Sequence, residues 1–131
     1  MRFDLLLQGG HLIDPKNNID GPMDLAISDG KVAAVDTAIP AGQAAKAIAV
    51  SAPSLAPGLV DIHSHMYGTG GGPNAWAGDN SIRPDGFSFR SGVTTMVDTG
   101  SAGWRIFPDF RNRVLERFET RKFAFLNITG L

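Results

Sequence analysis

The first third of the chain alternates between polar and apolar residues, a pattern typical of β-strands that bury one face. Two alternating runs, residues 24–28 and 31–35, are separated only by Asp29 and Gly30. This arrangement predicts a β-hairpin, because the type I′ turn needs two adjacent residues that accept positive φ.

Further short strands are expected on either side of this hairpin. Residues 3–8 form an apolar strand that we expect to end at the turn pair Gly9-Gly10, with residues 11–13 continuing it beyond the glycines. Residues 44–47 fit one helical turn, and residues 47–50 fit equally well as another strand. We therefore interpret residues 1–54 as a small β-domain.

From Pro57 onward the apolar residues run together instead of alternating. Residues 59–63, 93–98 and 123–128 are almost continuous apolar segments, which predicts buried strands of a parallel sheet. Residues 108–122 repeat apolar side chains at helical spacing and predict a helix directly before the third strand.

A long glycine-rich loop, residues 66–92, separates the first two of these strands, and 81–90 fit a short helix inside it. No helix follows the third strand to cover the sheet, so we expect residues 55–131 to be an interrupted βαβ-type fold.

Length and composition narrow the classes of protein. The chain has 131 residues, whereas a complete (β/α)8 barrel needs roughly 250. It has no cysteine, which excludes disulfides, thiolate zinc sites and cysteine nucleophiles. Its net charge of -1 argues against a nucleic-acid or anionic membrane surface. The apolar run near the N-terminus is too short for a signal peptide, so we expect a cytoplasmic protein.

His63 and His65 are the main candidates for chemistry. They flank Ser64 at the end of a predicted strand, so both side chains project to the same side, together with Asp61. Two imidazoles on one face can bind one divalent cation. The alternative is that the two histidines are unrelated polar residues at a strand end.

The run from Ala56 to His65, Ala-Pro-Gly-Leu-Val-Asp-Ile-His-Ser-His, resembles the signature of the amidohydrolase superfamily. Residues 92–98 resemble that family's second barrel strand, and 98–103 resemble its dihydroorotase-like amidohydrolase/deacetylase branch. The resemblance implies an α/β fold, in which an N-terminal β-sandwich segment precedes the first strands of an incomplete TIM-type (β/α)8 barrel.

The same resemblance implies a mechanism. His63 and His65 would bind a zinc ion, in a site that holds one or two divalent ions. A metal-bound hydroxide would then hydrolyse an amide, cyclic amide or ester bond of a small molecule. The family's later ligands, a lysine and two histidines, and its catalytic aspartate have no counterpart here. We therefore expect the chain to be the N-terminal third of such an enzyme, with little activity alone. The complete enzyme is expected to be a homo-oligomer that binds neither nucleic acid nor membrane.

Other side chains are weaker candidates. Asp98 ends the predicted second strand and either bonds to a ligand or metal-ligating histidine, or caps a loop. Tyr67, Trp76 and Arg83 lie in the long loop and either touch substrate or pack the loop. A different class of function also fits the chain: an inactive remnant or interaction module that associates through exposed strands.

Overall fold

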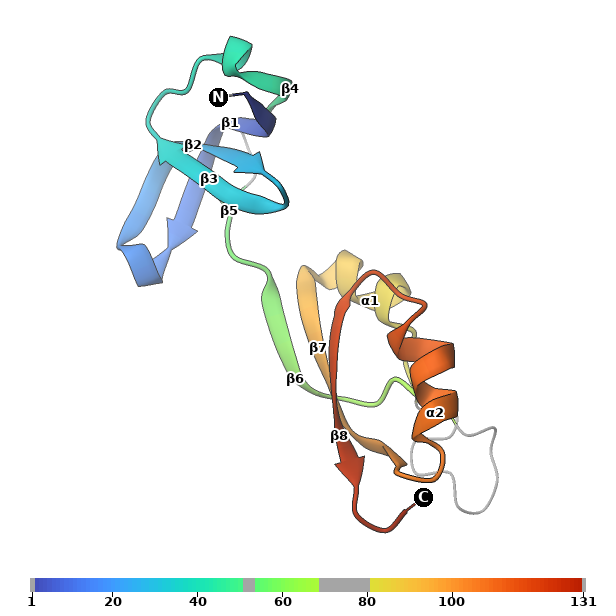
Figure 1. The fold of residues 1–131 in the computed structure, drawn as a ribbon. Helices are drawn as coiled ribbons and strands as arrows, with labels where there is room; N and C mark the ends of the chain where they lie inside the picture. The colour runs from blue at the N-terminus through green and yellow to red at the C-terminus, as the bar shows by residue number, and fades with distance from the viewer. Residues whose placement is uncertain (1, 51–53, 69–80, 131) are drawn as a thin grey trace. The chain divides into compact units, whose positions relative to one another are not determined.

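The computed structural model describes residues 2–50, 54–68 and 81–130. The chain divides into two compact units, Met1–Pro57 and Gly58–Leu131 (Figure 1). This boundary lies three residues after the predicted one, because the short strand around Leu55 pairs with the first strand of the chain. No helix in the described residues is long and apolar enough to cross a membrane.

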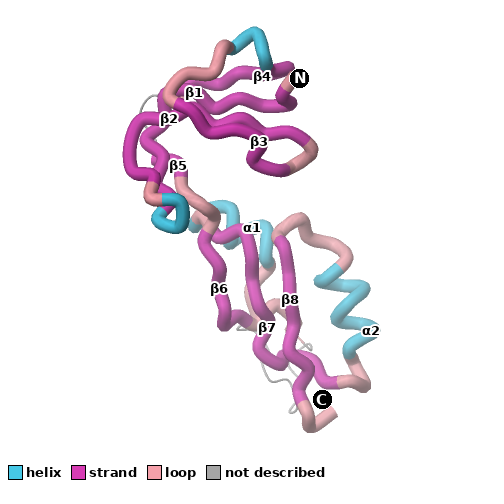
Figure 2. The backbone as a smooth tube through the Cα atoms, turned by 60° about the vertical axis from the view of Figure 1, so that its left-hand side comes forward, coloured by secondary structure: helices cyan, strands magenta, loops and turns pink. Residues whose placement is uncertain are grey.

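The first unit is a five-stranded sheet with the order β3-β2-β1-β4, in which β5 also pairs with β1. β1 pairs antiparallel with β2, and β2 with β3, whereas β4 and β5 run parallel to β1. Figure 2 shows these strands as one twisted layer. The strands are β1 (Phe3–Asp14), β2 (Ile19–Ser28), β3 (Lys31–Asp36), β4 (Ala44–Ala49) and β5 (Ser54–Leu55).

The predicted hairpin is confirmed. Asp29 and Gly30 join β2 to β3 with φ of 52° and 69°, the left-handed values that the type I′ turn requires. The strand does continue over residues 11–13 as predicted, but the predicted turn at Gly9-Gly10 is wrong, because β1 runs through both glycines. The pairing register with β2 shifts between Leu7 and Gly10, and Gly9 has a φ of 73°. This is a β-bulge, in which glycine supplies the positive φ without strain.

Ala44–Ala49 form strand β4, so the strand alternative holds and begins earlier than predicted. The helical turn considered for residues 44–47 lies instead at Ala41–Gln43. Pairing with β1 favours the strand conformation of β4, since the two strands run parallel and hydrogen-bond to each other. One face of the sheet is closed by a small core of buried apolar residues. These are Leu6, Ala26, Ile39 and Ala44.

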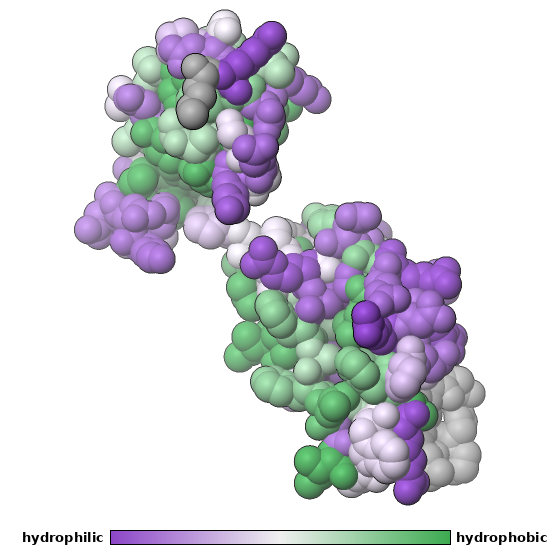
Figure 3. Space-filling view, in the orientation of Figure 1, coloured by the Kyte–Doolittle hydropathy of each residue, from purple (hydrophilic) through white to green (hydrophobic). Residues whose placement is uncertain are grey.

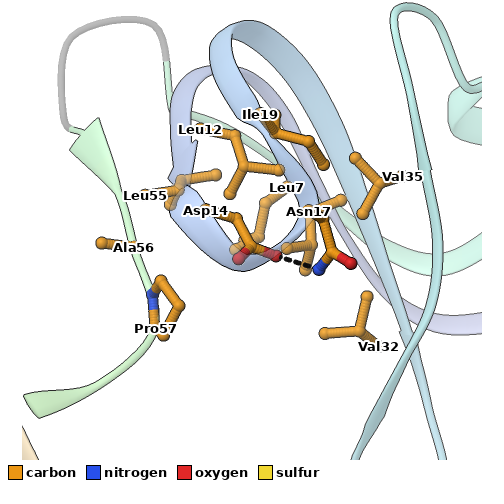
Figure 4. Close-up of a pocket in the computed structure, with 11 residues that line it drawn as sticks. Leu7, Leu12, Asp14, Asn17, Ile19, Val32, Val35, Leu55, Ala56 and Pro57 are labelled. Atoms are coloured by element: carbon orange, nitrogen blue, oxygen red, sulfur yellow. Dashed lines mark hydrogen bonds between the residues drawn. The ribbon is translucent and has the colours of Figure 1, made fainter.

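The other face of this sheet holds a hollow of about 590 Å³. Figure 4 shows apolar side chains such as Leu12, Val35 and Leu55 around it, and an Asn17 amide that donates to the Asp14 carboxylate at its edge. The described residues of this unit form one sheet, so the second layer of a sandwich remains a prediction.

The second unit is a three-stranded parallel sheet with the order β6-β7-β8. Its helices lie on one side of the sheet (Figures 1 and 2). The predicted order of strand, strand, helix and strand is present, and the short helix considered for residues 81–90 forms at Pro84–Ser91. The elements are β6 (Leu59–Ser64), α1 (Pro84–Ser91), β7 (Val93–Gly103), α2 (Phe107–Phe110), a π-helical turn (Arg111–Leu115) and β8 (Arg121–Asn127).

The predicted helix 108–122 is too long. α2 continues only into the π-helical turn that ends at Leu115, and Lys122 lies in β8 rather than at a helix end. The Asp85 carboxylate of α1 accepts hydrogen bonds from the backbone N–H groups of Glu119 and Thr120, both at 2.9 Å. This tertiary contact holds the chain in a non-helical conformation just before β8.

The prediction of buried strands is wrong for β6 and β8 within the described residues. Leu59 and Ile62 are 61% and 73% exposed, and Phe125 is 67% exposed. The helices cover one face of the sheet, and Figure 3 shows apolar atoms gathered over the strands of this unit. The core on the covered face consists of Met66, Tyr67, Met96, Ala102, Phe110 and Val114.

Candidate metal centre

The two candidate histidines lie side by side at the carboxyl end of β6. The ring centres of His63 and His65 are 5.6 Å apart, with the ring planes inclined by 74°. The extended backbone explains this spacing, because residues two apart along a strand project to the same side. The Asp61 carboxylate accepts a hydrogen bond from the backbone N–H of His63 at 3.0 Å, so it supports the strand end.

His65 also contacts the neighbouring strand. Its Nδ1 lies 3.0 Å from the hydroxyl oxygen of Ser101, which belongs to β7. Ser101 is 1% exposed, whereas His65 is half-buried. One ring nitrogen is thus occupied by the protein, and Nε2 is the nitrogen left for a ligand.

Asp98 lies inside β7 rather than at its end, and its side chain is fully buried. One carboxylate oxygen accepts from the backbone N–H of Met66 at 2.7 Å, and the other accepts from that of Ser101 at 2.8 Å. Of the two interpretations of Asp98, these contacts match a backbone cap and not a direct bond to a histidine ring. The two capped amides nevertheless belong to Ser101 itself and to the residue that follows His65.

Two further hydrogen bonds join β6 to β7 at the same level. The Ser64 hydroxyl donates to the carbonyl of Val97 at 2.9 Å, and the Thr99 hydroxyl donates to the carbonyl of Ser64 at 3.3 Å. The backbone between the two histidines is therefore held against the central strand.

Tyr67 packs into the second unit and bonds to α2. Its hydroxyl donates to the Asp109 carboxylate at 2.5 Å, and Arg113 approaches the same carboxylate at 3.3 Å. Burial, together with Asp109, raises the pKa of Tyr67 to about 12. The hydrogen bond from Tyr67 in turn lowers the pKa of Asp109. These contacts match the packing interpretation of Tyr67.

The other loop candidates are less defined. Arg83 is exposed and lines a hollow of about 270 Å³ together with Tyr67 and Arg113. Trp76 lies outside the described residues.

The residues present fit part of a metal site. Two imidazoles on one zinc have ring centres roughly 5 Å apart, since each nitrogen lies about 2.0–2.1 Å from the metal. The observed separation of 5.6 Å is close to that spacing. In the part of the chain that the structure describes, no three His, Cys, Asp or Glu side chains cluster as metal ligands. Catalytic zinc takes three protein ligands, so the histidine pair supplies two of a larger set.

Sequence reasoning missed Ser101. Its signal is local: Asp98 stands three residues before it, and aspartate side chains cap backbone N–H groups a few residues onward. The contact between Ser101 and His65 spans 36 residues and has no such signal.

Comparison with known proteins relates the chain to a group of hydrolases. A deacetylase of Agrobacterium fabrum is 40% identical over 103 residues, which are 79% of this chain and 24% of the deacetylase. The chain therefore spans about a quarter of the length of this curated relative. No family model matches the chain.

Solved structures agree with the sequence comparison. The crystal structure of a dihydroorotase matches with a TM-score of 0.70 and 35% identity, over 95% of this chain and 31% of that chain. D-aminoacylase, described as defining a subset of amidohydrolases, matches with a TM-score of 0.56 and 28% identity, over 75% of this chain and 19% of that chain. A further structure of D-aminoacylase concerns its binuclear metal centre.

The relatives share a class, hydrolases of amide and cyclic amide bonds. The chain belongs to the amidohydrolase superfamily.

Proposed function

We propose that this chain is the N-terminal part of a metal-dependent hydrolase that cleaves an amide, cyclic amide or ester bond of a small molecule. The observation that carries the proposal is the pair of adjacent imidazoles, His63 and His65, at the carboxyl end of β6 in an amidohydrolase fold. Active sites of barrel enzymes lie at the carboxyl ends of the parallel strands.

The chemistry of the relatives supports this proposal. Deacetylase, dihydroorotase and D-aminoacylase all act on carbon–nitrogen or acyl bonds by name, and D-aminoacylase has a binuclear metal centre. One or two zinc or similar ions fit the imidazole donors. A bound divalent cation supplies an acidified water and polarises the carbonyl oxygen of the substrate.

The chain's own residues hold and orient the ligands. His63 and His65 present two neutral nitrogen donors, and the bonds from Ser64 and Thr99 keep their strand against β7. In this proposal, the remaining metal ligands and the catalytic base belong to residues outside these 131. Apolar side chains such as Leu59, Ile62 and Phe125 are exposed on β6 and β8, which supports a larger barrel that covers them.

We also propose that the complete enzyme is cytoplasmic and a homo-oligomer. Both proposals rest on the resemblance to the family.

The experiment that tests the function is metal analysis of the full-length protein and of three histidine variants. His63→Ala and His65→Ala should each lose most of the bound metal and of the hydrolase activity. His11→Ala is the matched control, because His11 lies in the first unit and its exposed side chain bonds to Asp20. Full metal occupancy in His63→Ala or His65→Ala would overturn the proposal.

The exposed apolar strands also favour a second candidate function, a non-catalytic interaction module. A monodisperse monomer with one sharp unfolding transition would contradict it. Self-association of the 131-residue chain without bound metal would favour it.

A further inference from the structure

We propose that Ser101 is a positioning residue that holds the ring of His65 with Nε2 directed to the metal, and that Asp98 holds both partners of this pair in place. This inference rests on the proposed function, since it assigns the means by which one of the two histidines is oriented.

The first support is the contact between the two side chains. His65 Nδ1 and the Ser101 hydroxyl oxygen are 3.0 Å apart, a normal hydrogen-bond distance. A nitrogen that binds a metal carries no proton, so binding through Nε2 requires the proton on Nδ1. Nδ1–H then donates to the Ser101 oxygen, and this bond selects one tautomer and one ring orientation. Outer hydrogen bonds of this kind commonly orient metal-ligating histidines.

The second support is the way in which Ser101 is itself fixed. Its side chain is 1% exposed, and its backbone N–H donates to the Asp98 carboxylate at 2.8 Å. A buried hydroxyl on a strand held by a charged hydrogen bond has little freedom to move away. Ser101 is therefore a rigid acceptor for the histidine ring.

The third support is the second bond of Asp98. Its other oxygen accepts from the backbone N–H of Met66 at 2.7 Å, directly after His65. One fully buried carboxylate thus fixes the backbone beside His65 and the backbone of Ser101. Because Asp98 fixes both stretches of backbone, the Nδ1 atom of His65 and the hydroxyl of Ser101 are kept within hydrogen-bond distance.

His63 differs from its neighbour. Its side chain is exposed, and among the described residues its ring makes no side-chain hydrogen bond, although its backbone N–H donates to the Asp61 carboxylate. We therefore expect the structure to fix His65 before metal binds, and His63 to adjust its ring when metal binds.

The test combines nitrogen NMR of the histidine rings with zinc titration, both on the full-length protein. In the metal-free protein, His65 should carry its proton on Nδ1, and Ser101→Ala should abolish this preference. Ser101→Ala should also weaken zinc binding by about 10-fold to 100-fold, the usual cost of removing an outer partner of a ligand. Ser101→Thr keeps the hydroxyl and should restore both properties.

Ser88→Ala is the matched control. Ser88 is as buried as Ser101 and also bonds through its hydroxyl, but its partner is Thr120 Oγ1 at 2.7 Å. It should lose a buried hydrogen bond without changing the His65 tautomer or the zinc affinity. A comparable effect of Ser88→Ala on zinc affinity would mean that general destabilisation is the cause, and would overturn the inference.

The two proposals fail in different ways. An unchanged His65 tautomer and unchanged zinc affinity in Ser101→Ala overturn the positioning role alone. Zinc binding that survives His65→Ala overturns the proposed function, whatever the tautomer.

Discussion

Each unit of the molecule contains a buried aspartate that accepts two backbone hydrogen bonds, but the two carboxylates support different things. Asp24 in the first unit binds the N–H groups of Gly9 and Ile39, both at 2.8 Å. Asp98 in the second unit binds those of Met66 and Ser101. The two hydrogen bonds of Asp24 join a β-bulge to a loop over the core. The two hydrogen bonds of Asp98 lie next to the candidate metal ligands.

This comparison shows that residue type, burial and hydrogen bonding do not by themselves reveal what a side chain contributes to the protein. Both carboxylates sit on strands, both are buried, and both satisfy orphaned backbone donors. Only the neighbours of the capped amides differ. Asp24 therefore serves the stability of its unit, and Asp98 serves stability and, in our proposal, the orientation of His65.

The largest expected effect comes from replacing these two aspartates by asparagine. Each substitution removes the charge and sets an amide N–H₂ group against one backbone N–H. We expect Asp24→Asn and Asp98→Asn each to lower the free energy of unfolding by about 1.5–3 kcal/mol, the usual worth of hydrogen bonds to a charged group. Chemical denaturation measures both losses.

Zinc titration of the same variants sharpens the comparison. Asp98→Asn should weaken zinc binding, while Asp24→Asn should leave it unchanged because its contacts lie wholly in the first unit. Equal zinc affinities in the two variants would contradict the distinction between the two carboxylates.

A smaller effect is expected when acid neutralises Asp24. The N–H of Ile39 lowers the pKa of Asp24, with further help from Gly9, although burial opposes the shift. The unfolded chain therefore binds this proton at higher pH than the folded chain, and the stabilisation is complete above an unfolded pKa of about 3.9. It should disappear as the pH falls below about 4, through the lower folded pKa.

Denaturation of wild type and Asp24→Asn over this pH range measures the effect. The difference in stability between the two proteins should shrink as the pH falls below about 4. A difference that stays constant down to the most acid pH would show that the Asp24 charge contributes nothing.

The smallest expected effect concerns Tyr67, the single tyrosine of the chain. Its folded pKa of about 12 lies above the unfolded value of about 10. Its contribution to stability is thus complete below pH about 10 and is lost as the pH rises toward 12. Phenolate absorbance should report this residue alone and show no ionisation until the pH approaches 12.

Tyr67→Phe removes only the hydroxyl and should cost about 0.5–1.5 kcal/mol, the net value of a typical hydrogen bond, because the Asp109 carboxylate that accepts it is 52% exposed to water. Zinc affinity should not change, because the hydroxyl bonds to Asp109 of α2. Ionisation of wild-type Tyr67 near pH 10 would contradict the buried hydrogen bond.

Local signals in the sequence predicted the elements whose structure is decided by adjacent residues. Asp29-Gly30 specified its hairpin because the turn conformation depends on those two residues alone. The apolar runs specified the three strands of the second unit. The histidine spacing likewise specified two neighbouring rings, because alternation along an extended chain is a local property.

Elements that depend on distant partners were not predictable in this way. The strand at 44–49 is decided by pairing with β1, and the early end of the helix after Leu115 accompanies the bonds of Asp85 to residues 119 and 120. The sequence left both buried and exposed strands open, and only the structure shows that Ile62 and Phe125 are exposed, because an apolar pattern does not state which neighbours cover it.

The sequence by itself determined the family signature, the hairpin, the order of strands and helices, and the adjacency of His63 and His65, all of which follow from short-range covalent geometry. Only the tertiary structure decided that Ser101 meets His65 and that Asp98 accepts a hydrogen bond from the backbone of Met66. These two contacts join residues 36 and 32 positions apart, and the parallel pairing of β6 with β7 brings them together.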